Sequence, residues 1–584
     1  TMSGYNNFRP KWAMDGKEMI WGSDREGSRL QSGDLISGNI YAMFFSRDLF
    51  DKSKLTKEEF SILKDQESKD AKDKKDDKSQ VTAKSGKKTA ADLKAAADTA
   101  KKDIVIDWDN LTDRKVKLTT YTSAANDWIL SKDGEKLYYL TSFDKGNDLW
   151  VTELRTKDTK LLSKLGYNMV SMELSKDGKF LFILGDGMPY KVDVESGKTD
   201  PLKLTGEMVL NQAAERDYIF DHAWRQIKEK FYVADMQGVD WDYYYTDYKK
   251  FLPYISNNYD FSEMLSEMLG ELNASHTGCG YVPDNSNPDR TASLGLLYDY
   301  SYAGKGLRIA AVIKNGPMDK ASSKVKEGAI LEKIDGMSVD STDFYRLLNR
   351  KTGALVLLSF SDPVTGKSWD ESLKPISLGE ERELLYKKWV EERRAEVDRL
   401  SGGKIGYIHV RAMNDASMRT VFEEALGRYV GRDALVIDTR FNGGGNIHEQ
   451  LSDFLSGKKY YDIIPHGQYV GSEPYDKWTK SSIVIIGEGN YSDAHLFPVA
   501  YKLKNLGKTV GMPVPGTGTF VWWETQIDPT LYFGMPMGGW RTPDGKFCEN
   551  NQMEPDIKVR NEPDVMAAGR DQQIEAAVKE LMKK

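Results

Sequence analysis

The chain has 584 residues, of which 40% are hydrophobic, 29% charged and 11% aromatic. This length exceeds what a single core supports and suggests about four domains of ordinary globular composition. The net charge of −7 argues against nucleic acid as the main partner, and no apolar run approaches the ~20 residues of a membrane span. Two cysteines, Cys279 and Cys548, are too few for a disulfide framework and lack metal-site spacing.

Residues 1–207 contain a repeated turn. Asp-Gly pairs at Asp15, Asp133 and Asp177 each join two strand-like segments, which is a strong hairpin signal. The last two turns lie 177 − 133 = 44 residues apart, within the ~40–50-residue period of propeller blades. A closed propeller needs about four blades or more, and three turns are visible. We therefore expect a partial β-propeller that a preceding N-terminal polypeptide completes, which would make this chain the C-terminal part of a longer one.

An insertion at about residues 50–103 separates the first two turns. Its segment 61–103 has no aromatic residue and is dense in Lys, Asp, Ala and Ser. Such a segment cannot bury enough apolar surface to offset its ordering entropy, so we expect a solvated insertion that is disordered or loosely helical. The lysines invite a nucleic-acid interpretation, but the interleaved aspartates nearly cancel their charge.

Residues 208–290 change to helical periodicity. Apolar residues at Tyr218, Phe220, Ala223, Trp224 and Ile227 predict one amphipathic helix, and a second follows at 261–272. The predicted helical domain ends in a loop that carries Ser275 and His276, followed by glycines. A lone histidine in such a place is usually a surface or capping residue, so the loop by itself does not establish a site.

Residues 291–380 are dominated by short strands. A Gly-containing loop, Ser293-Leu-Gly-Leu-Leu297, precedes one strand, and Ile334-Asp-Gly336 forms a hairpin turn. The pair resembles a PDZ domain, which binds extended chains along a sheet edge. Two interpretations stay open, namely peptide capture and a rigid spacer that binds nothing.

Residues 381–584 alternate between strands and helices, which predicts a βαβ-type domain with a parallel or mixed sheet. A glycine run, Asn442-Gly-Gly-Gly445, directly follows the strand that ends at Asp438. Consecutive glycines let backbone N–H groups crowd toward a ligand. The loop lacks the Lys-Ser/Thr ending of a phosphate-binding loop and the dinucleotide spacing, so an oxyanion hole fits it better.

A second strand in this domain, Ile483 to Ile486, runs through a turn into a predicted helix at 494–503, and Ser492 occupies the turn. This geometry exposes a nucleophilic serine above the sheet and aims free N–H groups at it. The alternative is a serine that only caps the helix, because serine is a favoured N-cap residue.

The order of these motifs resembles the tricorn branch of the C-terminal processing peptidases, over nearly the whole chain and least over residues 1–200. The resemblance implies a serine endopeptidase or carboxypeptidase-like hydrolase with no cofactor and no metal, acting on peptides as a homo-oligomer, specifically a hexamer. It assigns the nucleophile to Ser492, the base to His276, a relay to Ser275 and Glu549, and the oxyanion donors to the N–H of Asp493 and of Gly443 or Gly444.

The chemistry agrees with these assignments. A serine hydroxyl needs a base to take its proton, and the imidazolium that forms needs an oriented carboxylate, here Glu549 acting through Ser275. We expect His276 within about 2.6–3.2 Å of Ser492, with the helical domain packed on the α/β domain and the PDZ-like domain to one side. The cysteines should then lie near the same cleft as free thiols. One departure is that Asp-Ala-His follows Ser492, where relatives often have Asp-Gly-Asp.

Three alternatives remain open. A Ser-Lys peptidase would use a lysine after the serine, and Lys502 or Lys504 would have to serve. A non-catalytic protein that binds peptides or apolar ligands could keep the same fold. A metallohydrolase would need clustered histidines, but the six histidines lack the His-Glu-x-x-His pattern. The propeller-like N-terminus and the Lys/Asp-rich insertion resemble those of bacterial secreted relatives, and this resemblance implies a periplasmic rather than a cytoplasmic location.

Overall fold

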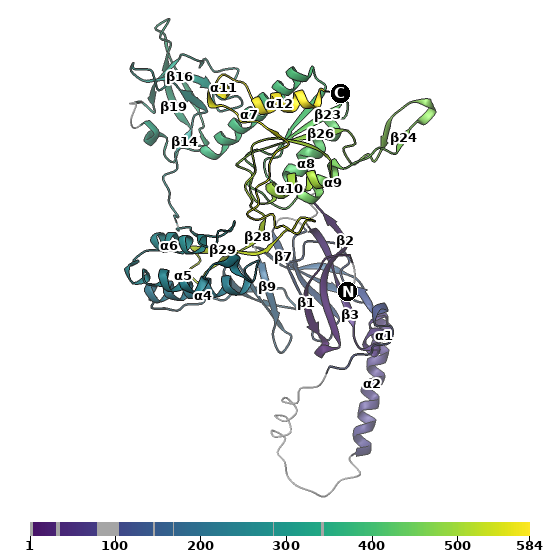
Figure 1. Ribbon diagram of the computed structural model, residues 1–584. Helices are drawn as coiled ribbons and strands as arrows, with labels where there is room; N and C mark the ends of the chain where they lie inside the picture. Colours follow the sequence, from purple (N-terminus) through teal and green to yellow (C-terminus); the bar gives the residue numbers. More distant parts are fainter. Residues whose placement is uncertain are drawn as a thin grey trace. The chain divides into compact units, whose positions relative to one another are not determined.

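The computed structural model describes residues 4–30, 35–78, 104–143, 146–167, 169–283, 285–339 and 344–583. The chain divides into two compact units, Thr1–Met208 and Val209–Lys584, and both combine sheets with helices (Figure 1). None of the helices described is long and apolar enough to cross a membrane.

The described residues of the first unit form three antiparallel sheets of four strands each, and the strands of each sheet follow one another in chain order. The sheets comprise β1 (Asn7–Ala13), β2 (Glu18–Arg29), β3 (Leu35–Phe44) and β4 (Lys115–Lys117); β5 (Asp127–Leu130), β6 (Lys136–Thr141), β7 (Asn147–Glu153) and β8 (Thr159–Tyr167); and β9 (Met169–Leu174), β10 (Phe180–Gly185), β11 (Met188–Asp193) and β12 (Thr199–Pro201). The propeller assignment stays a prediction, because strand order within each sheet does not establish a closed ring.

The predicted Asp-Gly turns join the first two strands of each sheet. At the second turn, Asp133 accepts hydrogen bonds from the Ser131 hydroxyl at 2.6 Å and from the Glu135 N–H at 3.1 Å. Asp177 does the same at the third turn. The glycines that follow have φ of 72° and 75°, a conformation that glycine adopts without steric cost. The repeated sequence is therefore a repeated side-chain-stabilised turn.

Two helices, α1 (Arg47–Ser53) and α2 (Lys57–Lys78), follow β3 in the first unit. Phe60 on α2 lies under the Arg155 guanidinium, 3.5 Å from the ring centroid. The insertion was expected to be either disordered or loosely helical, and its first part is helical. Residues 79–103 of the insertion lie outside the described residues.

The second unit begins with three helices, α4 (Gln212–Lys230), α5 (Trp241–Lys249) and α6 (Asn258–Gly270). They share one core with a three-stranded sheet whose order is β13-β29-β28. Strand β13 (Cys279–Tyr281) directly follows the Ser275-His276 loop, whereas β28 (Thr519–Thr525) and β29 (Leu531–Gly539) come from the C-terminal part of the chain. Figure 1 shows β29 beside these helices. Leu531, Phe533 and Met535 of β29 are buried in their core.

An antiparallel β domain follows, with its own core. Its main sheet has the order β15-β16-β17-β19-β20, with β18 paired to β17 and a separate pair β14-β21. The strands are β14 (Ala292–Ser293), β15 (Leu296–Tyr298), β16 (Leu307–Val312), β17 (Ile330–Ile334), β18 (Met337–Ser338), β19 (Val356–Ser361), β20 (Ser368–Leu373) and β21 (Ile376–Ser377). The predicted hairpin at Ile334 is formed by β17 and β18. The PDZ assignment stays a prediction.

The last part is an α/β domain built on a parallel sheet of order β22-β23-β26-β27-β30. Alternate residues of β23 and β26 enter two cores on opposite faces: Leu435 and Val484 pack with α8, α9 and α10, and Val436 and Ile483 pack with α7 and α12. The elements are α7 (Leu378–Ser401), β22 (Ile405–His409), α8 (Asp415–Glu423), β23 (Ala434–Asp438), α9 (His448–Leu455), β24 (Tyr461–Ile463), β25 (Gly471–Glu473), β26 (Ser481–Ile486), α10 (Asp493–Leu503), β27 (Gly507–Gly511), β30 (Ile557–Lys558), α11 (Pro563–Ala567) and α12 (Gln572–Leu581). The predicted parallel alternation is thus observed, with helices on both faces of the sheet.

Candidate active site

Ser492 lies in the turn between β26 and α10, at the carboxyl edge of the sheet. It occupies the N-cap position of α10, yet its side chain makes no capping hydrogen bond. Its backbone has φ 55° and ψ −123°, a conformation that costs a non-glycine residue about 1–3 kcal/mol and collects at functional sites. The capping interpretation therefore does not account for this serine.

The Ser275-His276 loop contacts the carboxylate of Glu549. Glu549 Oε1 accepts the Ser275 N–H at 2.5 Å, and Oε2 accepts the Ser275 hydroxyl at 2.8 Å. Burial raises the pKa of Glu549, and the Ser275 hydrogen bonds and the nearby backbone N–H groups of Gly518 and Thr519 oppose the shift. Ser275 thus approaches Glu549 as predicted.

These contacts select one tautomer of His276. Its Nδ1 lies 3.0 Å from Ser275 Oγ and 3.1 Å from Thr519 Oγ1. Ser275 donates to Glu549, and Thr519 has two acceptors for its own proton, Ser275 Oγ at 2.9 Å and the Ser275 carbonyl at 3.3 Å. The two hydroxyl oxygens therefore accept a proton from Nδ1, and Nε2 keeps the lone pair that a base requires. Burial also lowers the pKa of His276, which favours the neutral ring.

His276 and Ser492 belong to neighbouring segments, although 216 residues separate them. The His276 N–H donates to the Tyr491 hydroxyl at 2.8 Å, and the two rings pack with centroids 4.9 Å apart. The hydrogen bond that we predicted between His276 and Ser492 is not formed. The imidazole is instead held by its Nδ1 contacts with Ser275 and Thr519 and by the packing of its ring on Tyr491.

The glycine loop packs directly against Ser492. A Cβ at Gly444 would lie 2.7 Å from Ser492 Cβ, so only glycine fits there. The Gly444 N–H donates to Asn442 Oδ1 at 2.9 Å and is already engaged, which favours Gly443 as the donor from this loop. The Asp493 N–H is the first of α10 and has no partner within the helix. These two N–H groups are the candidate oxyanion donors.

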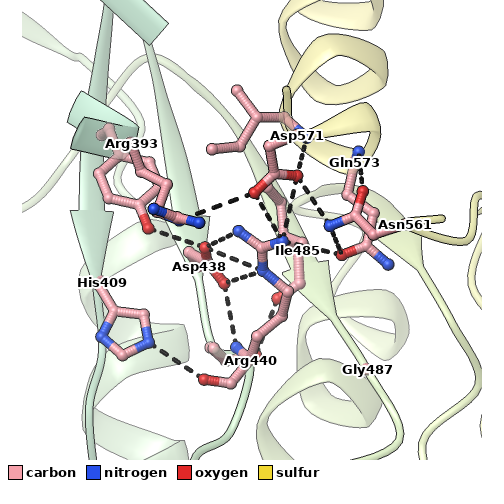
Figure 2. Close-up of polar contacts among 12 residues, drawn as sticks. Arg393, His409, Asp438, Arg440, Ile485, Gly487, Asn561, Asp571 and Gln573 are labelled. Atoms are coloured by element: carbon pink, nitrogen blue, oxygen red, sulfur yellow. Dashed lines mark hydrogen bonds and ion pairs between the residues drawn. The ribbon is translucent and has the colours of Figure 1, made fainter. Parts of the chain in front are cut away.

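A buried ion-pair network holds the start of this loop (Figure 2). Arg440 bonds Asp438 Oδ2 at 2.6 Å, Asp571 Oδ2 at 2.9 Å and Gln573 Oε1 at 2.9 Å. Asp438 is fully buried at the end of β23, and Asp571 caps α12 through the Ile574 N–H. Because each charge is paired and hydrogen-bonded, removal of one partner would leave an uncompensated buried charge. The network therefore fixes the direction in which the chain leaves the sheet.

The Asp493 carboxylate also links the turn at Ser492 to the glycine loop that precedes α9. It accepts the N–H of Ile447 at 2.6 Å and of His448 at 3.0 Å, and it also bonds the His448 side chain. Asp493, the residue after Ser492, thus accepts hydrogen bonds from the first backbone N–H groups of α9. The sequence-based prediction used only the N–H of Asp493 and missed this role of its side chain.

The residues that the alternative functions would need are not placed for those functions. Lys502 pairs with Asp556 at 2.9 Å, and Lys504 bonds Ser452 Oγ at 2.8 Å, so neither lysine reaches Ser492. Both cysteines are free thiols, and burial raises the pKa of each. Within the described ranges, no three His, Cys, Asp or Glu side chains are gathered as metal ligands would be.

His495, the third residue after Ser492, is 1% exposed. Its Nδ1 accepts the Thr517 N–H at 3.2 Å, and burial lowers the pKa of His495 from 6.5 to about 4. The unfolded chain therefore binds a proton at a higher pH than the folded chain does. From this residue alone we expect the free energy of unfolding to fall by ~3 kcal/mol as the pH drops from 6.5 to 4.

Denaturant unfolding at several pH values checks this expectation. Asparagine at 495 keeps an acceptor near the position of Nδ1 but does not titrate, so His495→Asn should flatten the pH dependence. His466→Asn, at an exposed histidine, should leave the pH dependence as in the wild type. Equal slopes for His495→Asn and the wild type would contradict the assignment.

Comparison with known proteins supports the motif order. The Tricorn protease C1 domain model matches residues 212–270, and the Peptidase family S41 model matches residues 404–559, which include Ser492 and Glu549. Tricorn protease homolog 1 of Streptomyces coelicolor is 28% identical over 73% of this chain and 42% of its own length. The tricorn protease of Thermoplasma acidophilum is 25% identical over 73% of this chain and 40% of its own.

A crystal structure of the tricorn protease superposes with a TM-score of 0.77, at 19% identity, over 100% of this chain and 55% of that one. The match to the S41 peptidase model thus covers the α/β part of the chain. Together the matches support a tricorn-like family member with a multidomain mixed α/β fold. The chain spans less than half the length of these curated relatives.

Proposed function

We propose that the chain hydrolyses peptide bonds, with Ser492 as nucleophile and His276 as base. The observation that carries the proposal is the backbone of Ser492, which is strained at the mouth of a strand–helix turn while its hydroxyl makes no capping bond. The match of residues 404–559 to the S41 peptidase family model supports the same reaction class. Peptides or unfolded protein segments are the proposed substrates.

In the proposed reaction, His276 Nε2 takes the proton of the Ser492 hydroxyl as the oxygen attacks the substrate carbonyl. The imidazolium that forms keeps its Nδ1 proton directed at Ser275 Oγ and Thr519 Oγ1, and Glu549 stabilises the positive charge through Ser275. The developing oxyanion would accept the N–H groups of Asp493 and Gly443. The protonated ring then donates to the leaving amine, and water repeats the sequence on the acyl-enzyme.

This reaction needs a neutral His276, so its rate should fall at acid pH. Because burial lowers the pKa of His276, we expect the acid limb of kcat/KM to have its midpoint below the ordinary histidine value of about 6.5. A pH–rate profile on a fluorogenic peptide measures the midpoint. A limb centred well above pH 6.5, or no fall at all, would contradict this role of His276.

A serine-directed fluorophosphonate tests the proposed function directly. It should label the wild-type chain, and peptide mapping by mass spectrometry should locate the adduct on Ser492. Incubation with a diverse peptide mixture should then give new termini that map the cleavage sites. A chain that binds peptides but neither cleaves them nor reacts would be a binding protein on this fold, and loss of activity with a chelator would indicate a metallohydrolase.

We also propose that the chain acts as a homo-oligomer, with a hexamer as the expected size, and light scattering of the purified chain measures it. Three further predictions remain. They are peptide binding by the PDZ-like domain, completion of the propeller-like sheets by a preceding polypeptide, and a periplasmic location.

A further inference from the structure

The segment Thr517-Gly518-Thr519 runs between the nucleophile and the base. It leads into β28, and all three residues are buried. The two threonines are two residues apart, and each contacts a different half of the proposed site. No motif in the sequence drew attention to this segment.

Thr517 holds the backbone of the nucleophile. Its Oγ1 accepts the N–H of Ser492 at 3.0 Å. Thr517 is itself held, because its own N–H donates to Nδ1 of His495 on the first turn of α10. The strained turn at Ser492 is therefore fixed by a residue outside the turn, and that residue is anchored by a buried imidazole that accepts its hydrogen bond in the neutral form.

Thr519 holds the base. Its Oγ1 lies 3.1 Å from His276 Nδ1 and donates to the Ser275 carbonyl at 3.3 Å. The side chain is 1% exposed, so water does not compete for these contacts. The imidazole thus has two acceptors for its Nδ1 proton, Ser275 and Thr519, and both favour the tautomer with a free Nε2.

Gly518 fixes the spacing between the two threonines. A Cβ at this position would lie 2.4 Å from Cys548 Cβ and 2.9 Å from the Glu549 nitrogen, so the backbone can approach Glu549 only as glycine. The backbone N–H groups of Gly518 and Thr519 both act to lower the pKa of the Glu549 carboxyl. One carboxylate therefore anchors the segment and also receives the Ser275 hydroxyl.

We infer that Thr517 and Thr519 are positioning residues for the reaction, and that the segment between them couples the placement of Ser492 to that of His276. The inference rests on the proposed function, in which Ser492 is the nucleophile and His276 is the base. The geometry assigns Thr517 to the orientation of the nucleophile and Thr519 to the orientation and tautomer of the base. Neither threonine need touch the substrate.

Valine substitutions test the inference, because valine keeps the shape of threonine and removes the hydroxyl. We expect Thr517→Val and Thr519→Val each to lower kcat by about 10- to 100-fold, as misplaced catalytic groups do, with KM changed by less than about threefold. Thr517→Ser and Thr519→Ser keep the hydroxyl and should restore most of the rate. Thr525→Val, at the exposed far end of β28, is the matched control and should behave as wild type.

The first-order rate constant for fluorophosphonate labelling of Ser492 is the second readout. It refers to each folded molecule, so a lower yield of folded variant does not affect it. Should a valine variant not fold, the alanine variant at the same position takes its place. Slower labelling with serine rescue supports the inference.

Two results would overturn it. Valine variants that label within twofold of wild type would show that the hydroxyls position nothing. Serine variants as slow as the valine variants would assign the effect to lost packing of the methyl group. A wild-type chain that does not label at Ser492 would instead overturn the proposed function, and this inference with it, so the two failures are distinguishable.

Discussion

Replacement of Ser492 by alanine is expected to lower kcat for peptide hydrolysis by about 10⁶-fold, the loss that follows removal of a triad nucleophile. The residual rate would come from binding and from the oxyanion donors. The fold should persist, because the Ser492 side chain does not cap α10 and alanine is no larger. Steady-state kinetics on a fluorogenic peptide measure the loss of kcat. Circular dichroism and light scattering check that the fold and the assembly are unchanged.

Ser456→Ala is a suitable control. It removes a hydroxyl that donates to the Asp453 carbonyl at the end of α9, outside the site, and should leave kcat unchanged. If the purified Ser492→Ala protein kept a tenth of the wild-type activity, Ser492 would not be the nucleophile.

Glu549→Gln is expected to lower kcat by about 10⁴-fold, the effect of forcing a catalytic histidine into the wrong tautomer. A glutamine carbonyl can replace one carboxylate oxygen, but its NH₂ group would face the Ser275 hydroxyl, which now donates to Oε2. Ser275 would then turn its proton toward His276 Nδ1. The proton of the ring would move to Nε2, and the lone pair that serves as base would be lost.

Glu554→Gln is the matched control, because this exposed glutamate lies five residues further along and pairs with Lys558. Its activity should match the wild type. If Glu549→Gln retained more than a tenth of wild-type kcat, the carboxylate would not act through Ser275. Comparison with Ser275→Ala, which removes the intermediate hydroxyl, should give a loss of similar size.

Much of the fold could be predicted because the periodicities are local. The apolar repeat near Phe220 and the β-branched run at Ile483 each report which face of one element is buried. The Asp-Gly turns likewise carry their stabilising side chain and their glycine within five residues. Ser492 could be predicted as a turn residue for the same reason, since strand, turn and helix follow one another directly.

The rest of the site depends on long-range contacts that leave no periodic signal. Glu549 and Ser275 meet across 274 residues, and only a resemblance to a known family paired them. Thr517 and Thr519 were not predicted, because two threonines in a glycine-rich segment are also typical of an ordinary loop. The choice of Gly443 over Gly444 needed the position of one amide oxygen, Asn442 Oδ1.

The helical domain is built from two segments that lie far apart in the sequence, because β28 and β29 belong to the C-terminal part of the chain. Its core is closed by Leu531, Phe533 and Met535, which the ribosome adds only after the β domain and most of the α/β domain. A nascent chain therefore carries His276 through the addition of the next 531 − 276 = 255 residues before β29 begins. The proposed catalytic pair should therefore form only after β28 and β29 have been added, so under the proposed function a growing polypeptide should not cut itself or its neighbours before then.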